Sequence, residues 1–342
     1  MFDPKSDLKD ALFERARGLG IDAIGVAPVD PALRREYYLA WIADGRHGDM
    51  KWMERNNDRR LHPSRVLPEA RSIICAGLNY YQPDPDGRGK IAKYALGLDY
   101  HDVLLGKLAD LCDWIRDHGG DAKPYVDTGP VLEKPLAVQA GLGWQAKNTM
   151  LVNSAAGNWL FLGEIFTTLN LPANEPVSDH CGTCSACITA CPTDAITAPY
   201  KIDARRCIAY LTIEHKGAIP VEFRTLIGDR LFGCDDCLDV CPWNRWAQTT
   251  RETALNAKPH PDLREMLGWD DEDFRTHFRN TPVHRLKLSR WLRNICVVLG
   301  NIGEQADLPA LRKTAARGDP LVAEHADWAI DRIEERLASA TL

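Results

Sequence analysis

The sequence lacks the segments that would place a protein in or across a membrane. No stretch has about 18 consecutive apolar residues, the length that a membrane-spanning helix needs. Residues 1–20, MFDPKSDLKDALFERARGLG, have no apolar core of the kind found in a signal peptide. Hydrophobic residues make up 45% and charged residues 26% of the 342, as in an ordinary globular protein. We therefore expect a cytoplasmic protein with no membrane partner.

Common cofactor fingerprints are missing too. The sequence contains neither G-x-G-x-x-G, which binds dinucleotides, nor the phosphate-binding G-x-x-x-x-G-K-[ST]. The formal charge of -6 argues against indiscriminate nucleic-acid binding, although it leaves room for a local basic surface. Cysteine, in contrast, is abundant. Eleven cysteines in a reducing compartment indicate metal or redox chemistry rather than disulfides.

Seven of the cysteines form two related runs, and an eighth lies between them. Residues 180–192, HCGTCSACITACP, match C-x2-C-x2-C-x3-C-P, in which three cysteines bind one 4Fe-4S cluster and the fourth reaches a second cluster. Residues 233–242, GCDDCLDVCP, repeat the pattern without its middle cysteine, and Cys207 between the runs completes the count. We assign one cluster to Cys181, Cys184, Cys187 and Cys241, and the other to Cys191, Cys207, Cys234 and Cys237.

A pair of zinc sites is the alternative for these cysteines, because structural zinc also uses C-x2-C pairs. Three cysteines at three-residue steps, and a Cys-Pro ending each run, favour the clusters. The remaining Cys75, Cys112 and Cys296 lie in apolar patterns and are expected to be inert core residues.

The rest of the chain predicts an α/β domain over residues 1–175 and a helical region over 251–342. Helical and strand patterns alternate in the first part, with helices expected at 7–20 and 100–120 and strands at 21–29, 71–81, 148–153 and 158–171. The linker NLPANEPVSD leads into the cysteine-rich segment, 176–250. Helices are expected at 288–303, 308–318 and 321–338.

Residues 125–153 predict a ligand site around Asp127. A strand ends there, a Thr-Gly-Pro turn follows, and the strand ends of α/β sheets are where such folds bind ligands. The alternative is that Asp127 or Thr128 only caps a helix. Residues 99–106, DYHDVLLG, are similar to the Asp-x-His-x-x-Gly signature of cobalamin proteins, but Leu104 replaces the glycine. We therefore reject that motif and expect Asp99 to cap the following helix.

Three further stretches, together with the cysteine runs, carry a family resemblance. They are GDMKWMERNNDRRLHP, VDTGPVLEKPLAVQAGLGWQAKNTMLV and GNWLFLGEIFTTL. With them the chain resembles the bacterial epoxyqueuosine reductases over nearly all of residues 1–250. The resemblance implies base-off cobalamin beside two 4Fe-4S clusters, a ferredoxin-like domain at 176–250, and reduction of the epoxide of epoxyqueuosine at the tRNA wobble position.

The resemblance also implies that Asp127 donates a proton near cobalt. Because free aspartate titrates near about 3.9, we expect an apolar pocket covered by the corrin macrocycle to raise its pKa. Lys147, Asn148 and Thr149 are candidates for holding the corrin amides or the substrate, with ordinary turn residues as the alternative. Arg60 is a further cofactor candidate, and a solvated surface position is its alternative.

A basic segment predicts where RNA binds. In HRLKLSRWLRN, Lys287, Arg290 and Arg293 recur on one expected helical face and could contact phosphates of the anticodon stem-loop, although a solvated helix face is the alternative. The helices that follow resemble a short HEAT-like repeat.

Three classes of function fit these features. A cobalamin reductase acting on tRNA accounts for the clusters, the α/β domain and the basic segment together. A reductive dehalogenase fits the cofactors, but those enzymes usually carry a twin-arginine export signal, and residues 1–20 do not show one. A ferredoxin-type carrier leaves about 175 N-terminal residues without a role. The first is favoured, as a monomer that receives electrons from a reduced donor protein.

Overall fold

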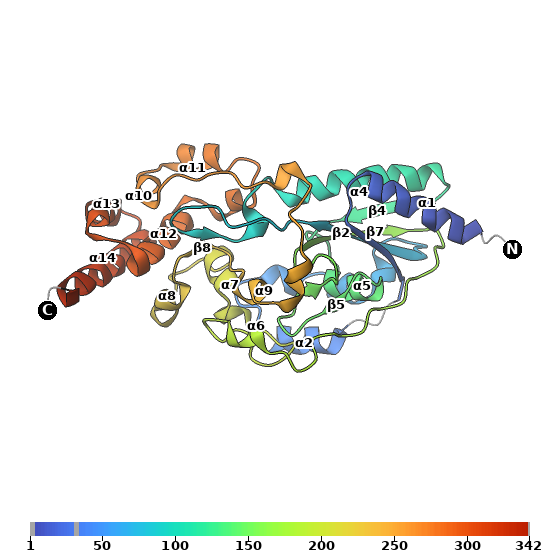
Figure 1. The fold of residues 1–342 in the computed structure, drawn as a ribbon, viewed down its shortest axis with the longest axis horizontal. Helices are drawn as coiled ribbons and strands as arrows, with labels where there is room; N and C mark the ends of the chain where they lie inside the picture. The colour runs from blue at the N-terminus through green and yellow to red at the C-terminus, as the bar shows by residue number, and fades with distance from the viewer. Residues whose placement is uncertain (1–3, 31–33, 341–342) are drawn as a thin grey trace.

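The computed structural model describes residues 4–30 and 34–340. Figure 1 shows an elongated molecule, with the N-terminal sheet at one end, the C-terminal helices at the other, and the cysteine-rich segment between them. The α-helices are α1 (Pro4–Gly18), α2 (Arg35–Ala43), α3 (Asn57–Leu61), α4 (Tyr100–Asp117), α5 (Glu133–Gln139), α6 (Ala186–Thr189), α7 (Ile208–Ile213), α8 (Val221–Ile227), α9 (Asp236–Asp239), α10 (Leu263–Met266), α11 (Asp271–His277), α12 (Leu288–Ile302), α13 (Leu308–Ala315) and α14 (Pro320–Ala340). The strands are β1 (Ala23–Pro28), β2 (Ser72–Asn79), β3 (Lys90–Ile91), β4 (Ala122–Tyr125), β5 (Trp144–Gln145), β6 (Leu151–Val152), β7 (Leu160–Thr167) and β8 (Arg230–Phe232).

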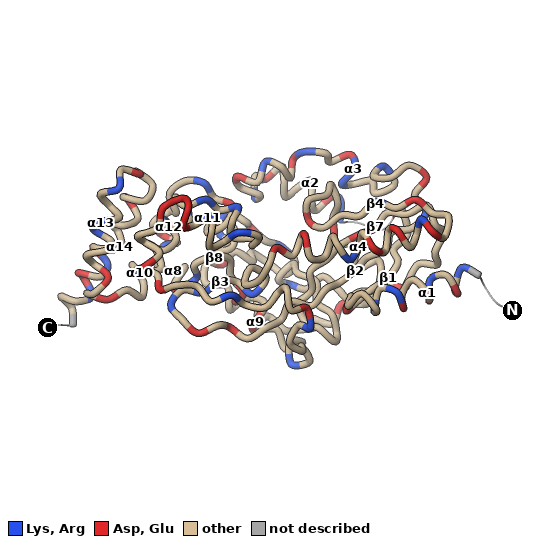
Figure 2. The backbone as a smooth tube through the Cα atoms, turned by 90° about the horizontal axis from the view of Figure 1, so that it is seen from above, with Lys and Arg blue, Asp and Glu red and all other residues tan. Residues whose placement is uncertain are grey.

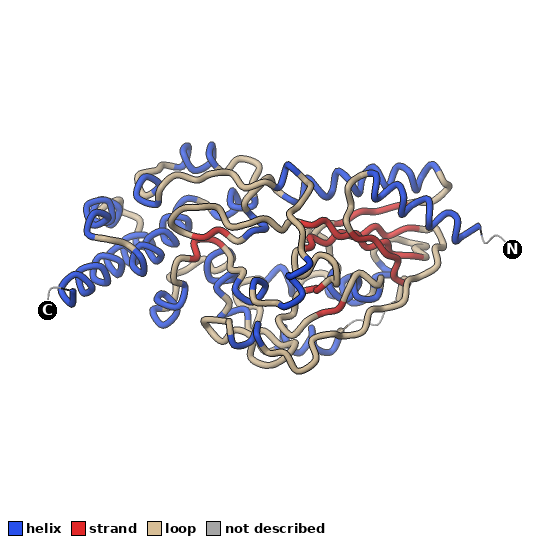
Figure 3. The backbone as a smooth tube through the Cα atoms, viewed as in Figure 1, coloured by secondary structure: helices blue, strands red, loops and turns tan. Residues whose placement is uncertain are grey.

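The main sheet has the strand order β1-β2-β7-β4, and every neighbouring pair is antiparallel. The expected helices and strands of the N-terminal part are present, but the α/β argument for a site at the strand ends does not apply to this sheet. Its strands β2 and β7 are covered on both faces (Figure 3). A doubly covered strand is a continuous apolar run in either direction, so the sequence pattern did not distinguish parallel from antiparallel pairing.

Helices α1 and α4 cover one face of the sheet, and α5 packs on the other. Gly25 of β1 permits the close approach of α5, because a Cβ atom at this position would lie 2.0 Å from the carbonyl oxygen of Ala140. The loop between β4 and α5, which carries Asp127, begins at the opposite edge of the sheet, where β4 ends.

The C-terminal helices form a second core, and it includes part of the N-terminal half. Helices α12 and α13 both pack against α14, as the periodicity predicts for these segments. Strand β3 pairs in parallel with β8, and Ile91 joins Leu231 and Ile295 in the same apolar cluster. Residues from all three expected regions therefore share one apolar core.

Charged residues of both signs alternate along most of the chain (Figure 2). Within residues 4–30 and 34–340, none of the helices combines the length and the apolar character needed to cross a membrane.

Candidate functional site

The first predicted cluster set surrounds a small cavity. Its four cysteines line a space of about 50 Å³ together with Ala146, His180 and Trp243. Burial raises the pKa of the Cys187 thiol, and the neighbouring thiols that raise it further are Cys181, Cys241 and Cys184. Among the described residues no three His, Cys, Asp or Glu side chains converge on one point suited to a single ion. Four thiols around a cavity are the arrangement that fits a 4Fe-4S cluster.

The second predicted set is also brought together. Burial raises the pKa of the Cys237 thiol, and the thiols that raise it further are Cys207, Cys234, Cys191 and Cys187. Because Cys187 belongs to the first set, the two sets are neighbours. Helices α6 and α9, one from each cysteine run, pack together. The amide of Ala195 donates to Sγ of Cys191 at 3.2 Å, a contact that stabilises a thiolate ligand. Cys75, Cys112 and Cys296 are buried core residues, as expected.

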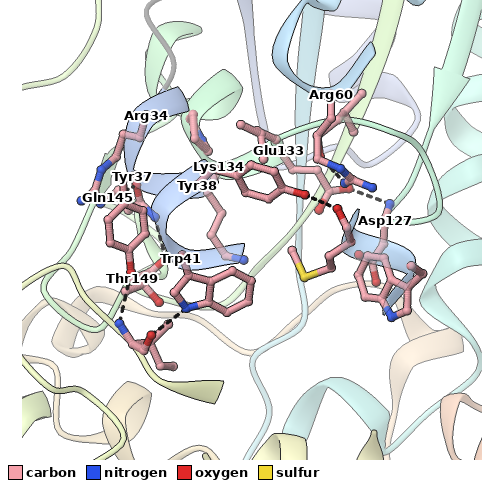
Figure 4. Close-up of a pocket in the computed structure, with 16 residues that line it drawn as sticks. Arg34, Tyr37, Tyr38, Trp41, Arg60, Asp127, Glu133, Lys134, Gln145 and Thr149 are labelled. Atoms are coloured by element: carbon pink, nitrogen blue, oxygen red, sulfur yellow. Dashed lines mark hydrogen bonds between the residues drawn. The ribbon is translucent and has the colours of Figure 1, made fainter. Parts of the chain in front are cut away.

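A larger cavity of about 340 Å³ lies between α2, α3 and the loop before α5. Figure 4 shows Arg34, Tyr37 and Thr149 on one side of it and Arg60 and Asp127 on the other. Its lining also includes further aromatic and cationic side chains, namely Tyr38, Trp41, Trp52 and Lys134.

Arg60 provides the test of whether this cavity suits a bound group. It lies on α3, 6% exposed, and donates from Nη1 to the carbonyl oxygen of Val131 at 3.3 Å. Its Nε is buried and has no hydrogen-bond partner among the described residues. A buried donor without an acceptor is costly, so a ligand acceptor at this wall would be stabilising. Aromatic walls with a few polar donors fit a macrocycle that carries amide groups.

Asp127 lies where two cavities meet. It lines the larger cavity and also a second one of about 280 Å³, whose cationic residues are Lys216, Arg285 and Arg290. The side chain is half exposed, and it faces these two cavities. Its backbone φ of +57° is in the left-handed region, which aspartate tolerates better than most residues.

Three groups hold Asp127 in place. The Tyr100 hydroxyl donates to Oδ2 at 2.6 Å, and Nε2 of His101 lies 3.4 Å from the same oxygen. The backbone amide of Asp127 donates to Oε1 of Glu133 at 2.6 Å. His101 in turn contacts Oδ1 of Asp99 through Nδ1 at 2.6 Å. The N-terminus of α4 therefore supplies two of the three contacts.

The protein groups around Asp127 act on its pKa in opposite directions. Burial acts to raise the pKa of Asp127, but the contacts with His101 and Tyr100 outweigh it and lower the pKa to about 2. The neighbouring Glu133 shows the expected behaviour instead, because burial and the charge of Asp127 raise its pKa to about 7. Two hydrogen-bond donors that converge on the carboxylate of Asp127 therefore oppose the increase in pKa that is expected from a macrocycle-covered pocket.

Two family models match the chain. Residues 60–128 match the model described as epoxyqueuosine reductase QueG, DUF1730. Residues 180–244 match the 4Fe-4S double cluster binding domain. The protein therefore carries a double 4Fe-4S cluster domain, in the segment where the cysteine spacing predicts it.

A curated relative decides the family. The epoxyqueuosine reductase of Xanthomonas campestris is 42% identical over 330 residues, which cover 92% of this chain and 93% of that protein. The chain belongs to the epoxyqueuosine reductase family. It is thus an oxidoreductase, as the sequence predicts.

Solved epoxyqueuosine reductases share the fold. One, crystallised with an epoxyqueuosine-modified tRNA-Tyr stem loop, is 32% identical with a TM-score of 0.89, covering 96% of this chain and 90% of that one. Another, from Bacillus subtilis, has its catalytic aspartate loop swung out of the active site. It is 31% identical with a TM-score of 0.88, at the same coverage of 96% and 90%.

Within this family member, only one of three neighbouring cofactor candidates reaches the larger cavity. Thr149 lines it. Lys147 instead donates from Nζ to the carbonyl oxygens of Gly182 and Cys184, at 2.6 and 2.8 Å. Asn148 is 2% exposed and donates to the carbonyl oxygen of Cys237 at 3.0 Å. The side chains of Lys147 and Asn148 thus hold the cysteine loops, and their contact with a cofactor stays a prediction.

The predicted basic face is also corrected. Arg293 is fully buried and donates to the carbonyl oxygens of Leu211, His215 and Gly217. Arg290 is half-buried, and Lys287 precedes α12 and is exposed. The three side chains do not form one solvent-facing stripe, because this helix turns its Arg293 side into the core.

Sequence reasoning missed His101, Tyr100, Glu133 and Arg285. The Asp-x-His word contains His101, but the sequence indicates no role for this residue other than that of a cobalt ligand. Asp99 caps α4 by accepting from the His101 amide, as predicted, and it also pairs with Arg285 at 2.9 Å. A contact between residues of α4 and the loop after β4 leaves no local signal in the sequence.

Proposed function

We propose that this protein reduces the epoxide of epoxyqueuosine in tRNA to the alkene of queuosine, with Asp127 as the acid that protonates the departing oxygen. The observation that carries the proposal is the position of Asp127 at the junction of two cavities, beside the double-cluster segment. The relative crystallised with an epoxyqueuosine-modified stem loop supports the choice of substrate.

Cobalamin is the cofactor that we propose for the larger cavity. When bound, it would supply low-valent cobalt that passes electrons from the clusters to the strained epoxide. Arg60, with its buried unpartnered Nε, and Thr149 are the residues that would hold it. The two cysteine sets given above are the proposed cluster ligands.

The chain's own residues would position and protonate the substrate. Tyr100 and His101 hold the carboxylate of Asp127 toward both cavities. The swung-out aspartate loop of the Bacillus subtilis relative supports a loop at this position that can adopt more than one conformation.

The second cavity is the proposed approach of the RNA. Lys216, Arg285 and Arg290 would attract phosphates, and the modified base would leave its stack to reach Asp127. Lys287 remains a candidate at the exposed start of α12.

We also propose a cytoplasmic monomer that takes electrons from a reduced donor protein. Its regions would be a cobalamin-binding part at 1–175, a ferredoxin-like part at 176–250 and a HEAT-like part at 251–342, the last supported by the packing of α12 to α14.

Anaerobic reconstitution tests the function. The protein is loaded with iron, sulfide and cobalamin, reduced, and incubated with tRNA carrying epoxyqueuosine, and the nucleosides are then analysed for queuosine. We expect conversion by the wild type. Asp127→Ala should retain both clusters and cobalamin but lose turnover, whereas Asp113→Ala, an exposed site on α4, should behave as wild type. An unimpaired Asp127→Ala enzyme would remove the assigned acid, and a wild type without turnover would overturn the function.

A further inference from the structure

His101 lies between two carboxylates. Its Nδ1 is 2.6 Å from Oδ1 of Asp99, its Nε2 is 3.4 Å from Oδ2 of Asp127, and its side chain is 10% exposed. An ionised carboxylate can only accept hydrogen bonds, so each ring nitrogen that faces one is expected to carry a hydrogen. The geometry therefore favours the doubly protonated, cationic ring.

The electrostatic surroundings agree with this protonation state. Burial acts to lower the pKa of His101, but its contacts with Asp127 and Asp99 outweigh burial and raise the pKa to about 9. Arg285 opposes this increase, with its guanidinium nitrogens 3.3 and 3.4 Å from the ring nitrogens. The other titratable groups that line the adjoining cavity are Tyr94, Tyr100, Glu214, Lys216 and Arg290.

The proposed reaction consumes two protons. Converting an epoxide into an alkene breaks both C–O bonds and forms two O–H bonds. It takes up two electrons, which the reduced donor supplies through the clusters, and the oxygen leaves as water. Asp127 is held as an anion by Tyr100 and His101, so it has no proton of its own to give. Each proton that it passes on must first reach it from a neighbour.

We propose that His101 stores the proton that Asp127 passes to the epoxide oxygen, and that Asp99 fixes the ring for this transfer. The inference rests on the proposed function. The proton moves from Nε2 of His101 to Oδ2 of Asp127 and then to the departing oxygen, and the ring is reprotonated through the cavity that it lines before the second transfer. His101 is a positioning residue that acts through Asp127.

Glu133 is the competing source. Its carboxyl group accepts from the backbone amide of Asp127, so it contacts the main chain of the acid, whereas His101 contacts the carboxylate. A comparison of His101→Gln with Glu133→Gln separates the two sources. His118, an exposed histidine that stacks on Trp114 at the other end of α4, offers a matched control.

The first measurement is the rate of single turnover against pH, using the full chain loaded with clusters and cobalamin. For the wild type we expect a rate that is high below pH 9 and falls as His101 loses its proton near pH 9. His101→Gln should lower the rate at pH 7 by roughly 100-fold, within the range for general acid catalysis, and should lose the fall near pH 9. Glu133→Gln and His118→Gln should both keep the fall in rate near pH 9.

The second measurement does not depend on activity. Histidine labelled with ¹³C in the full-length protein, with oxidised clusters and cob(III)alamin, gives a signal for His101 that His101→Gln removes. We expect this signal to titrate near pH 9 and to move toward the ordinary value of about 6.5 in Asp127→Asn.

Each result decides the inference. A His101 signal that titrates near 6.5 in the wild type would overturn it. So would an unchanged pH profile in His101→Gln, or loss of the fall near pH 9 in Glu133→Gln alone. A wild type that makes no queuosine would overturn the proposed function instead. The NMR titration would still report the protonation state of His101.

Discussion

The hydroxyl of Tyr100 donates a 2.6 Å hydrogen bond to Oδ2 of Asp127, a residue 27 positions later in the chain. The Tyr100 ring stacks on Phe161 of β7, with ring centroids 4.2 Å apart and planes at 4°. The hydroxyl is therefore positioned by the sheet, and the loop that carries Asp127 is tethered to a rigid element.

Removal of this hydroxyl should weaken the positioning of Asp127 and slow turnover, but turnover should not be lost. In Tyr100→Phe the ring can still stack on Phe161, but Asp127 loses one of the two donors that lower its pKa. We expect the pKa of Asp127 to rise from about 2 and single turnover to slow by roughly 10-fold, since a charge-assisted hydrogen bond contributes about 1.5–3 kcal/mol. Stopped-flow kinetics checks this expectation, with Tyr81→Phe as the control variant. A Tyr100→Phe enzyme as fast as wild type would show that the tether is dispensable.

Arg60 should control the affinity for cobalamin. Its guanidinium is buried at the wall of the larger cavity, and Lys at this position cannot present a donor where Nε lies. We expect Arg60→Lys to weaken cobalamin binding by about 10-fold, which corresponds to about 1.4 kcal/mol. The exposed neighbour Arg59 gives the control, Arg59→Lys. Absorbance titration with cobalamin measures both, and equal affinities for the two variants would argue against a contact at Arg60.

Lys147 should control the occupancy of the first cluster. Its ammonium group joins the carbonyl oxygens of Gly182 and Cys184, and so closes the loop that carries two predicted ligands. In Lys147→Met these acceptors lose their donor, so we expect less iron and sulfide per chain after reconstitution. Lys201→Met changes an exposed lysine and should retain full loading. Full iron content in Lys147→Met would assign this lysine a role outside cluster assembly.

Arg293 should affect stability rather than RNA affinity. Arg293→Met removes the donors to three backbone carbonyls, one of them buried, and we expect the free energy of unfolding to fall by about 3 kcal/mol. Lys287→Met, at an exposed position, should change it by less than about 0.5 kcal/mol. Urea unfolding followed by circular dichroism gives both values. A stable Arg293→Met protein with weaker tRNA binding would instead support the predicted contact between Arg293 and RNA phosphates.

Low pH should weaken the contact between Arg88 and Asp307 at the C-terminal helices. Asp307 is fully buried and accepts from Arg88 and Arg264. Burial acts to raise its pKa, but these arginines and the Glu304 amide lower it to about 2. A depressed folded-state pKa stabilises the fold above the unfolded value of about 3.9, and this stabilisation is lost as the pH falls toward 2. Asp307→Asn should flatten the pH dependence of the unfolding midpoint in this window.

Much of the local structure follows from the sequence. The cysteine spacing predicts the double-cluster domain that the family comparison confirms, because a cluster needs thiolates at short, regular intervals along the chain. Helical periodicity predicts α4 and α14, since each buries one apolar stripe. It also predicts α12, although this helix is buried on every side over residues 291–300. The Asp-Thr-Gly-Pro turn likewise predicts that Asp127 follows the end of a strand, as it does after β4.

What the sequence by itself determined is what depends on neighbours in the chain: the elements, the cysteine runs and the turn at Asp127. Only the tertiary structure decided the antiparallel order of the sheet, the burial of Arg293 and the use of Lys147 and Asn148 at the cysteine loops. It alone also set the protonation of Asp127, because Tyr100 and His101 reach its carboxylate from another element. A side chain's charge state depends on the groups that surround it in space, and these come from distant positions in the chain.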